Sequence, residues 1–438
     1  MPPLLALSHR GLGAAAGGGS GGAGLAESLP GARQQRAIEI VGTACENGIV
    51  WTRRSFLSYF VGAGVAAAYT EEPQVTVIQT PENGVQPQAA VDARGTIHLI
   101  YLYGDPAAAD IGYTFKRRGE RDFSKPVRVN SQPGSAIAVG TMRGARLALG
   151  RAGRVHVAWN GSRSAEPRAA RDSSPMLYAR MRDDGRGFEP QKNLNHAGWG
   201  LDGGTVAADR FGHVYVAWHA QPLQAGGAPQ NEGSRRVWLA RSSDDGRTFE
   251  PDVAVSPKST GVCGCCGMAA LADREGNLYL MYRSAREIVH RDMYLLFSRD
   301  QGKNFEAVDL QAWEIGACPM STSSLYDCDG RVMAAWETNK QIYFATLSQN
   351  GRAPAKIIPV PGSGDNRKHP ALAIDKRGNV LLAWTEGTGW KKGGTLHWDE
   401  MRLAEGGIAQ STPGTPEPVT AWNAPAAVTV QNRFLIIC

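Results

Sequence analysis

Four cysteines are the residues whose types and spacing most directly suggest chemistry. Cys263, Cys265 and Cys266 form a Cys-x-Cys-Cys pattern, and Cys318 lies in the segment GACPMSTS. Thiolates prefer soft ions, so four convergent cysteines would bind Cu(I) or zinc. The alternative is a disulfide between Cys318 and one of the other three, the usual state of cysteines in an oxidising compartment. Both interpretations stay open, and no cofactor beyond such an ion is expected.

Acidic and basic residues beside short apolar strands form a second candidate set. Glycoside hydrolysis needs two carboxylates across a cleft, one of them protonated near neutral pH. Glu337 and Glu386 occupy equivalent positions of successive repeats and are the candidate pair. The alternative is an ion-pair network that holds loops together. The full set of candidate catalytic residues is Arg143, Asp202, His219, Arg283, Glu337, Arg367 and Glu386.

A turn-and-strand repeat predicts the fold that must position these residues. Six segments between residues 90 and 387 read as an apolar run, a Gly turn and an alternating apolar strand, and their turn glycines are Gly95, Gly153, Gly212, Gly276, Gly330 and Gly378. Glycine supplies the positive φ of a hairpin turn, and alternation predicts strands. Steps of 58, 59, 64, 54 and 48 residues suit four-stranded propeller blades. We therefore predict an all-β, six-bladed β-propeller of four-stranded antiparallel blades over residues 75–438.

The ends of this region suggest how the ring closes. The C-terminal segment 424–438 reads as a strand, a turn at Gln431-Asn432 and a second strand. Propellers commonly close by letting one end of the chain complete a blade begun by the other. We expect the C-terminal strands to join residues 74–80 or the first blade. A seventh, degenerate blade is the alternative.

Blade topology sorts the loops onto two faces. The repeated turns join the first and second strands, so the loops that lead into each first strand lie on the opposite face, together with the ends of the second strands. This face would collect the cysteine trio, Cys318 and the candidate catalytic residues. Function in propellers concentrates where such loops converge around the axis.

A second repeat carries a family resemblance. SSDDGRTF (Ser242–Phe249) and SRDQGKNF (Ser298–Phe305) fit Ser-x-Asp-x-Gly-x-Thr/Asn-Phe, and MRDDGRGF (Met181–Phe188) fits it apart from its first residue. The pattern resembles the Asp-box of the sialidase-like propeller superfamily. The resemblance implies a turn between the third and fourth strands, held by the Asp side chain, with the aromatic residue packed between sheets. It also implies a protein that acts on or binds glycans.

Two marks of authentic sialidases are missing. The family places Phe/Tyr-Arg-Ile-Pro in the first blade, where this chain has ENGVQPQAAV (Glu82–Val91). The family's nucleophilic Tyr comes from the last blade, whereas the last tyrosine here is Tyr343. We therefore predict a glycosidase-like or a non-catalytic binding propeller, not an authentic sialidase.

The N-terminal residues 1–68 predict export. Residues 51–68 contain Arg53-Arg54, a short apolar run and a final Ala-Ala-Ala, and they resemble a twin-arginine signal peptide. Its apolar run is too short for a stable membrane span. Residues 1–50 are Gly- and Ala-rich, and we expect a disordered extension, which an incorrectly assigned start codon would explain. The resemblance implies the twin-arginine export machinery as a partner and a periplasmic or extracellular location.

Composition limits the remaining partners. The formal net charge is +6, and no basic run with interleaved aromatics occurs, so nucleic-acid binding is not expected. The expected ligand is a glycan or another extracytoplasmic molecule. We expect the protein to be a monomer.

Overall fold

The computed structural model describes residues 74–140, 143–170, 173–222, 231–405 and 407–438, which belong to one unit, Thr70–Cys438. The predicted extension (1–50) and export signal (51–68) lie outside the described residues. Within the described ranges, no helix is both long enough and apolar enough to cross a membrane.

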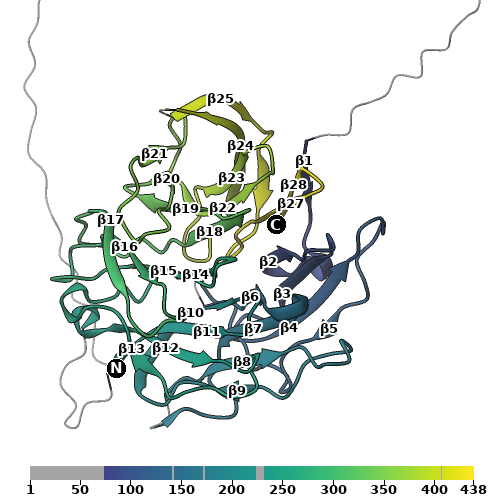
Figure 1. Cartoon of the computed structure of the whole chain (residues 1–438), viewed down its shortest axis with the longest axis vertical. Helices are drawn as coiled ribbons and strands as arrows, with labels where there is room; N and C mark the ends of the chain where they lie inside the picture. The colour runs from purple at the N-terminus through teal and green to yellow at the C-terminus, as the bar shows by residue number, and fades with distance from the viewer. Residues whose placement is uncertain (1–73, 141–142, 171–172, 223–230, 406) are drawn as a thin grey trace, which may run out of the picture. The chain divides into compact units, whose positions relative to one another are not determined.

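Six antiparallel sheets surround a common axis, with the first strand of each sheet innermost (Figure 1). The first three sheets are formed by β2 (Val85–Val91), β3 (Ile97–Asp105), β4 (Ala108–Lys116) and β5 (Val127–Arg128); β6 (Arg146–Leu149), β7 (Val155–Asn160), β8 (Met176–Arg180) and β9 (Lys192–Asn193); and β10 (Gly198–Ala208), β11 (Val214–Pro222), β12 (Arg236–Ser242) and β13 (Val253–Ala254). The next three are formed by β14 (Ala269–Ala272), β15 (Leu278–Arg283), β16 (Met293–Ser298) and β17 (Glu306–Gln311); β18 (Ser323–Cys328), β19 (Arg331–Thr338), β20 (Gln341–Thr346) and β21 (Ile358–Pro359); and β22 (Lys368–Ile374), β23 (Asn379–Glu386), β24 (Gly394–Ala404) and β25 (Gly407–Pro413). β26 (Glu417–Val419) also pairs with β24. Short 3₁₀ helices lie in the connections at η1 (Pro81–Asn83), η2 (Arg151–Gly153), η4 (Glu232–Ser234) and η5 (Lys258–Thr260).

A seventh sheet closes the ring, so the prediction of six blades is wrong. β27 (Ala426–Val430) and β28 (Arg433–Ile437) form a hairpin, and β1 (Val75–Ile78) pairs with β28 as a parallel strand. The expected joining of the C-terminal strands to residues 74–80 is confirmed. This blade escapes the repeat count because its turn uses Gln431 and Asn432 at φ 52° and 61° in place of a turn glycine.

The seventh sheet packs as a blade against both neighbours. Phe434 and Ile436 are buried against side chains of the sixth sheet, whereas Ala426 and Ile437 are buried against the first. Side chains alternate between the two faces of a strand, so one apolar segment can serve both contacts. The three-stranded sheet thereby fills the gap that six sheets leave in the ring.

Aspartates stabilise both kinds of turn, although this role was predicted only for the aspartates of the second repeat. Between β10 and β11, Oδ1 of Asp209 accepts hydrogen bonds from the N–H groups of Phe211 and His213, both at 2.9 Å. Between β12 and β13, Oδ1 of Asp244 accepts from the N–H of Thr248 at 2.9 Å. In the same turn, the Phe249 ring lies edge-on to Tyr178 of the preceding blade, with ring centroids 4.8 Å apart. These turns position the blades and leave the opposite face free for the site.

Candidate functional site

The ends of the second strands lie where the repeat predicts. His219 is near the end of β11, Arg283 ends β15, Glu337 is next to last in β19, and Glu386 ends β23. In each sheet the innermost strand runs from this face to the turn that joins it to the second strand, and the antiparallel second strand returns to this face. We call this face, with the loops that lead into the innermost strands, the leading face.

The three thiols of the Cys-x-Cys-Cys loop converge just before β14. Sγ of Cys263 lies 3.2 Å from Sγ of Cys265 and 3.6 Å from Sγ of Cys266, and all three sulfurs lie within 4.8 Å of one another. Bonds of about 2.3 Å place two sulfurs on one ion at most about 4.6 Å apart. After small side-chain rotations, one ion can therefore contact all three thiols.

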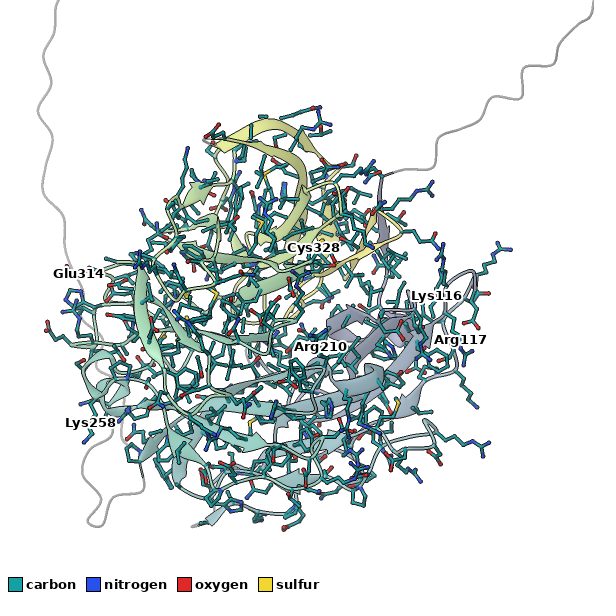
Figure 2. The ribbon with its side chains drawn as sticks, in the orientation of Figure 1. Lys116, Arg117, Arg210, Lys258, Glu314 and Cys328 are labelled. Carbon is teal, nitrogen blue, oxygen red and sulfur yellow. The ribbon has the colours of Figure 1, made fainter. Side chains whose placement is uncertain are left out.

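All six cysteines in the described ranges are free thiols. The disulfide expected between Cys318 and the trio is not formed, since Cys318 and all three cysteines of the trio are free. Cys318 still approaches the cluster: its sulfur, Sγ of Cys265 and a carboxylate oxygen of Glu232 lie within 4.8 Å of one another. Cys328, labelled in Figure 2, lies at the other end of β18 from Cys318 and belongs to no such group.

Hydrogen bonds tie the cysteine loop to three blades. The N–H of Cys263 donates to the carbonyl of Arg283 at 2.9 Å, and the N–H of Gly267 donates to the carbonyl of Ser321 at 2.9 Å. The N–H of Gly264 donates to Oε1 of Glu232 at 2.8 Å. Because these partners come from the fourth, fifth and third sheets, the closed ring, not the loop alone, determines where the sulfurs lie.

Two buried arginines beside the sulfurs have unused donors. Arg291 pairs through Nη2 with Oε2 of Glu232 at 2.7 Å, but its Nε and Nη1 are buried without hydrogen-bond partners in the described structure. Arg283 donates from Nη1 to the carbonyl of Arg291 at 2.7 Å and from Nη2 to the carbonyl of Glu337, which leaves its Nε without a partner. Unmade hydrogen bonds of buried charged groups are costly. The charges of both arginines act on the nearby cysteines.

The thiols differ in how readily they ionise. Burial opposes ionisation of Cys266, but hydrogen bonds from Cys263 and Cys265 and the charge of Arg283 hold the pKa of the Cys266 thiol well below its usual range. The pKa of Cys265 is raised by its hydrogen bonds to the other two thiols and by burial. One thiolate is thus favoured before any ion binds, and the others must lose protons when an ion binds.

The two candidate carboxylates occupy opposite environments. Glu337 is 1% exposed, its Oε2 is buried without a partner among the described residues, and burial raises its pKa to about 7. Although burial opposes its charge, Glu386 has a lowered pKa because Trp384 and the N–H of Asp365 donate to it and Arg367 lies nearby. Nε of Arg367 is 3.1 Å from Oε1 of Glu386.

The remaining candidates are engaged in contacts that hold the leading face together. Nε of Arg143 lies 2.6 Å from Oδ1 of Asp202, so these two neutralise each other. Nε2 of His219 lies 3.3 Å from the carbonyl oxygen of Cys266. Burial lowers the pKa of His219 to about 4, so its ring is neutral at pH 7. The structure therefore brings His219, but not the Arg143–Asp202 pair, into contact with the cysteine loop.

Sequence reasoning omitted Glu232, which contacts this loop. Glu232 lies in the connection between β11 and β12, which leaves the leading face just after the candidate position His219. A search of that connection for charged residues would have found it. Arg291 lies in the equivalent connection after Arg283, in a stretch that the sequence shows to be rich in arginine. Met268, in contrast, follows the loop closely but is buried in the apolar core between the third and fourth sheets.

Replacing Glu337 by glutamine is expected to stabilise the protein at neutral pH. The raised pKa means that the folded state binds more protons than the unfolded state between pH 4.5 and about 7, so wild-type stability falls as the pH rises through this window. The loss amounts to about 3 kcal/mol for this group. Chemical denaturation at pH 5 and pH 8 should show that E337Q lacks this decline. Glu386→Gln is the matched control. Because the pKa of Glu386 is lowered, this variant should be less stable than wild-type protein above pH 4.5. If E337Q showed the same pH dependence as wild-type protein, the raised pKa of Glu337 would be contradicted.

The fold and site define an all-β propeller with seven sheets and a buried cysteine cluster on its leading face. Comparison with family models and with curated proteins found no match. Similar solved structures include a Hadza microbial sialidase, at 13% identity over 74% of this chain and 70% of that one, with a TM-score of 0.43. They also include a leech intramolecular trans-sialidase, at 9% over 81% and 85% with a TM-score of 0.46. A Penicillium chrysogenum alpha-L-arabinanase is 14% identical over 80% and 96%, with a TM-score of 0.43. No residue of the site is assigned from these similarities.

Proposed function

We propose that this propeller binds one thiophilic ion, Cu(I), through Cys263, Cys265 and Cys266. The observation that carries the proposal is the convergence of the three sulfurs within 4.8 Å. Soft thiolates select Cu(I) and zinc. Structural zinc sites use four ligands, and the fourth cysteine, Cys318, groups with Cys265 and Glu232 instead of with the whole trio. This grouping favours Cu(I).

Charge compensation supports the same assignment. Three thiolates with one Cu(I) carry two excess negative charges. Arg283 and Arg291 supply two positive charges beside them, and that of Arg291 is shared with Glu232. Although burial opposes its charge, Arg291 has a raised pKa because Cys263, Glu232 and Cys265 lie nearby. A buried ionic cluster is tolerated when its charges are paired and hydrogen-bonded. The unused guanidinium donors are available for those hydrogen bonds.

The resemblance of residues 51–68 to a twin-arginine signal adds a proposed setting. Such a signal would export the chain already folded, and the ion could then be inserted before the thiols meet an oxidising compartment. The twin-arginine machinery is the corresponding proposed partner.

Metal analysis of the full chain tests the proposal. The protein is purified under reducing, oxygen-free conditions and titrated with Cu(I) against a chromophoric chelator, with zinc in a parallel titration. We expect one Cu(I) per chain to be retained, with weaker retention of zinc. A folded protein whose thiols titrate as free but which yields all its copper to the chelator would refute the proposal.

Glycoside hydrolysis is the second candidate, and it rests on Glu337 and Glu386. Their pKa values are shifted in opposite directions, which is the arrangement that a general acid and an ionised carboxylate require. They are linked through Arg367, whose N–H donates to the carbonyl of Lys340 at 3.1 Å while the N–H of Lys340 donates to Oε1 of Glu337 at 3.1 Å. A glycan is the proposed ligand of this function.

A panel of aryl glycosides and oligosaccharides tests the second candidate. If wild-type protein turns over a substrate, Glu337→Gln and Glu386→Gln should each lower kcat about 100-fold or more. Glu250→Gln, an exposed residue following an Asp turn, should leave kcat unchanged. Full turnover in the double variant, or no turnover by wild-type protein, would remove hydrolysis from consideration.

A further inference from the structure

The axis of the ring contains a cavity that neither function above uses. Its volume is about 170 Å³, and residues at or beside the innermost strands of all seven sheets border it. Among these described residues Arg146, which begins β6, is the one charged side chain. The rest are apolar, hydroxyl or amide residues. A cavity of this size has room for several waters or one small ligand.

Arg146 has no counter-charge in the described structure. It takes part in no ion pair or hydrogen bond there, and its Nε is buried without a partner. Burial lowers its pKa to about 10, so the guanidinium remains charged at neutral pH. Buried charges in proteins are normally paired, because an isolated one is costly. The structure thus presents a cation to the axial cavity and no protein anion to match it.

A second donor and a glycine complete the site. Oγ of Ser323 borders the same cavity and is also buried without a partner among the described residues. A Cβ at Gly267 would lie 3.2 Å from Nη2 of Arg146, so the glycine leaves space for the guanidinium. Gly267 directly follows Cys266, which places the cavity next to the cysteine loop.

We propose that the axial cavity binds a small oxyanion of the carboxylate class, with Arg146 as its charged partner and Ser323 as a second donor. A guanidinium offers two parallel N–H groups that match the two oxygens of a carboxylate, whereas a spherical halide uses this geometry less well. None of these groups is a thiol. Failure of one of the two proposed sites would therefore not refute the other.

Calorimetric titration of the full chain with acetate and with chloride, at constant ionic strength, tests the proposal. Wild-type protein is expected to bind acetate saturably and chloride more weakly. Arg146→Gln should lose at least ten-fold in acetate affinity, and Arg146→Lys should lose less, since it keeps the charge without the paired donors. Arg352→Gln removes the same charge from an exposed position and should bind as wild type does.

Melting temperatures distinguish an anion site from a merely structural role of Arg146. In acetate-free, chloride-free buffer, R146Q should melt at or above the wild-type temperature, because it removes a half-buried charge that has no counter-charge. Acetate should then raise the wild-type Tm and leave R146Q unchanged. Equal responses of the two proteins, or no saturable binding by folded wild-type protein, would overturn the anion site. Chloride binding tighter than acetate would overturn its oxyanion class.

Discussion

Replacing Cys266 by serine is expected to weaken Cu(I) binding at least about 100-fold, since even loss of a residue that only supports a metal ligand costs 10–100-fold. Cys266 is the thiol whose pKa is lowered, and it is 4% exposed, so no water can readily take its place. Cys263→Ser should have a comparable effect. Competition against a chromophoric Cu(I) chelator measures the affinity of each variant.

Cys328→Ser is the matched control for this prediction. It removes one thiol from the same chain, but Cys328 is the last residue of β18, where its sulfur donates to the carbonyl of Asp375 at 3.6 Å. Copper affinity should remain at the wild-type value. Equal loss in C266S and C328S would indicate general damage to the fold, and wild-type affinity in both C266S and C263S would exclude the proposed site.

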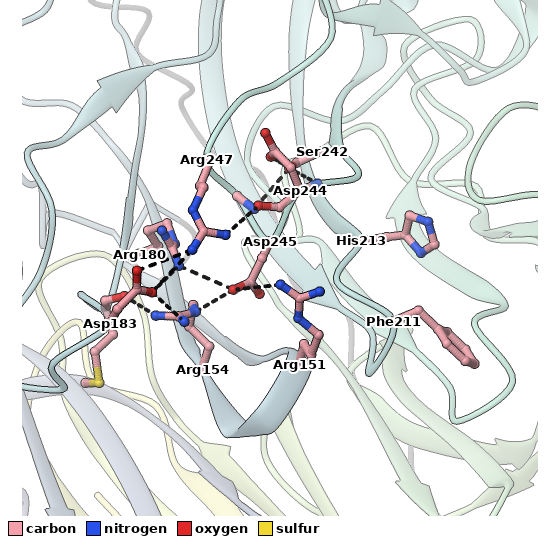
Figure 3. A network of polar contacts seen from close by, with 12 residues as sticks. Arg151, Arg154, Arg180, Asp183, Phe211, His213, Ser242, Asp244, Asp245 and Arg247 are labelled. Atoms are coloured by element: carbon pink, nitrogen blue, oxygen red, sulfur yellow. Dashed lines mark hydrogen bonds and ion pairs between the residues drawn. The ribbon is translucent and has the colours of Figure 1, made fainter.

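Replacing Asp245 by asparagine is expected to lower the free energy of unfolding by about 3 kcal/mol, because it weakens charged hydrogen bonds to Arg154 and Arg180. Both arginines keep Asp183 as an ion-pair partner, which limits the loss. Asp245 is 1% exposed, and its Oδ2 lies 2.5 Å from Nε of Arg154 and 3.3 Å from Nη2 of Arg180, as Figure 3 shows. Arg180 is itself only 1% exposed. Asparagine keeps the shape and tolerates the positive φ of 63° at this position, so the change isolates the charge. Urea denaturation at pH 7 measures the loss.

Asp184 is the control for Asp245, because it occupies the same position of the preceding Asp turn. Asp184 is exposed and its side chain accepts a hydrogen bond from the N–H of Arg186 alone. Asp184→Asn should change stability by less than about 0.5 kcal/mol. The pKa of Asp245 is lowered to about 2 by His156 and Arg154 despite burial, so wild-type stability should fall as the pH drops from 4 toward 2. A D245N protein as stable as D184N would contradict the account.

The sequence by itself was sufficient to predict the four-stranded blades and the face of the ring that carries the candidate residues. Turn residues and alternation act locally: Gly212 must adopt positive φ, and Asp209 binds N–H groups only two and four residues away. Once these hairpins are placed, strand direction alone carries Cys263 and Glu337 to one face. That prediction required no knowledge of distant contacts.

Only the tertiary structure decided the number of sheets and which partners the site residues have. The seventh sheet depends on β1 pairing with β28 across nearly the whole unit, and a parallel pairing between chain ends leaves no local pattern. Likewise, Arg143 meets Asp202 59 residues away, and the unused donors of Arg283 and Arg291 emerge only after other blades have occupied the rest of each guanidinium. Burial and the closing of the ring set these distances and charges, and neither is a property of any single segment.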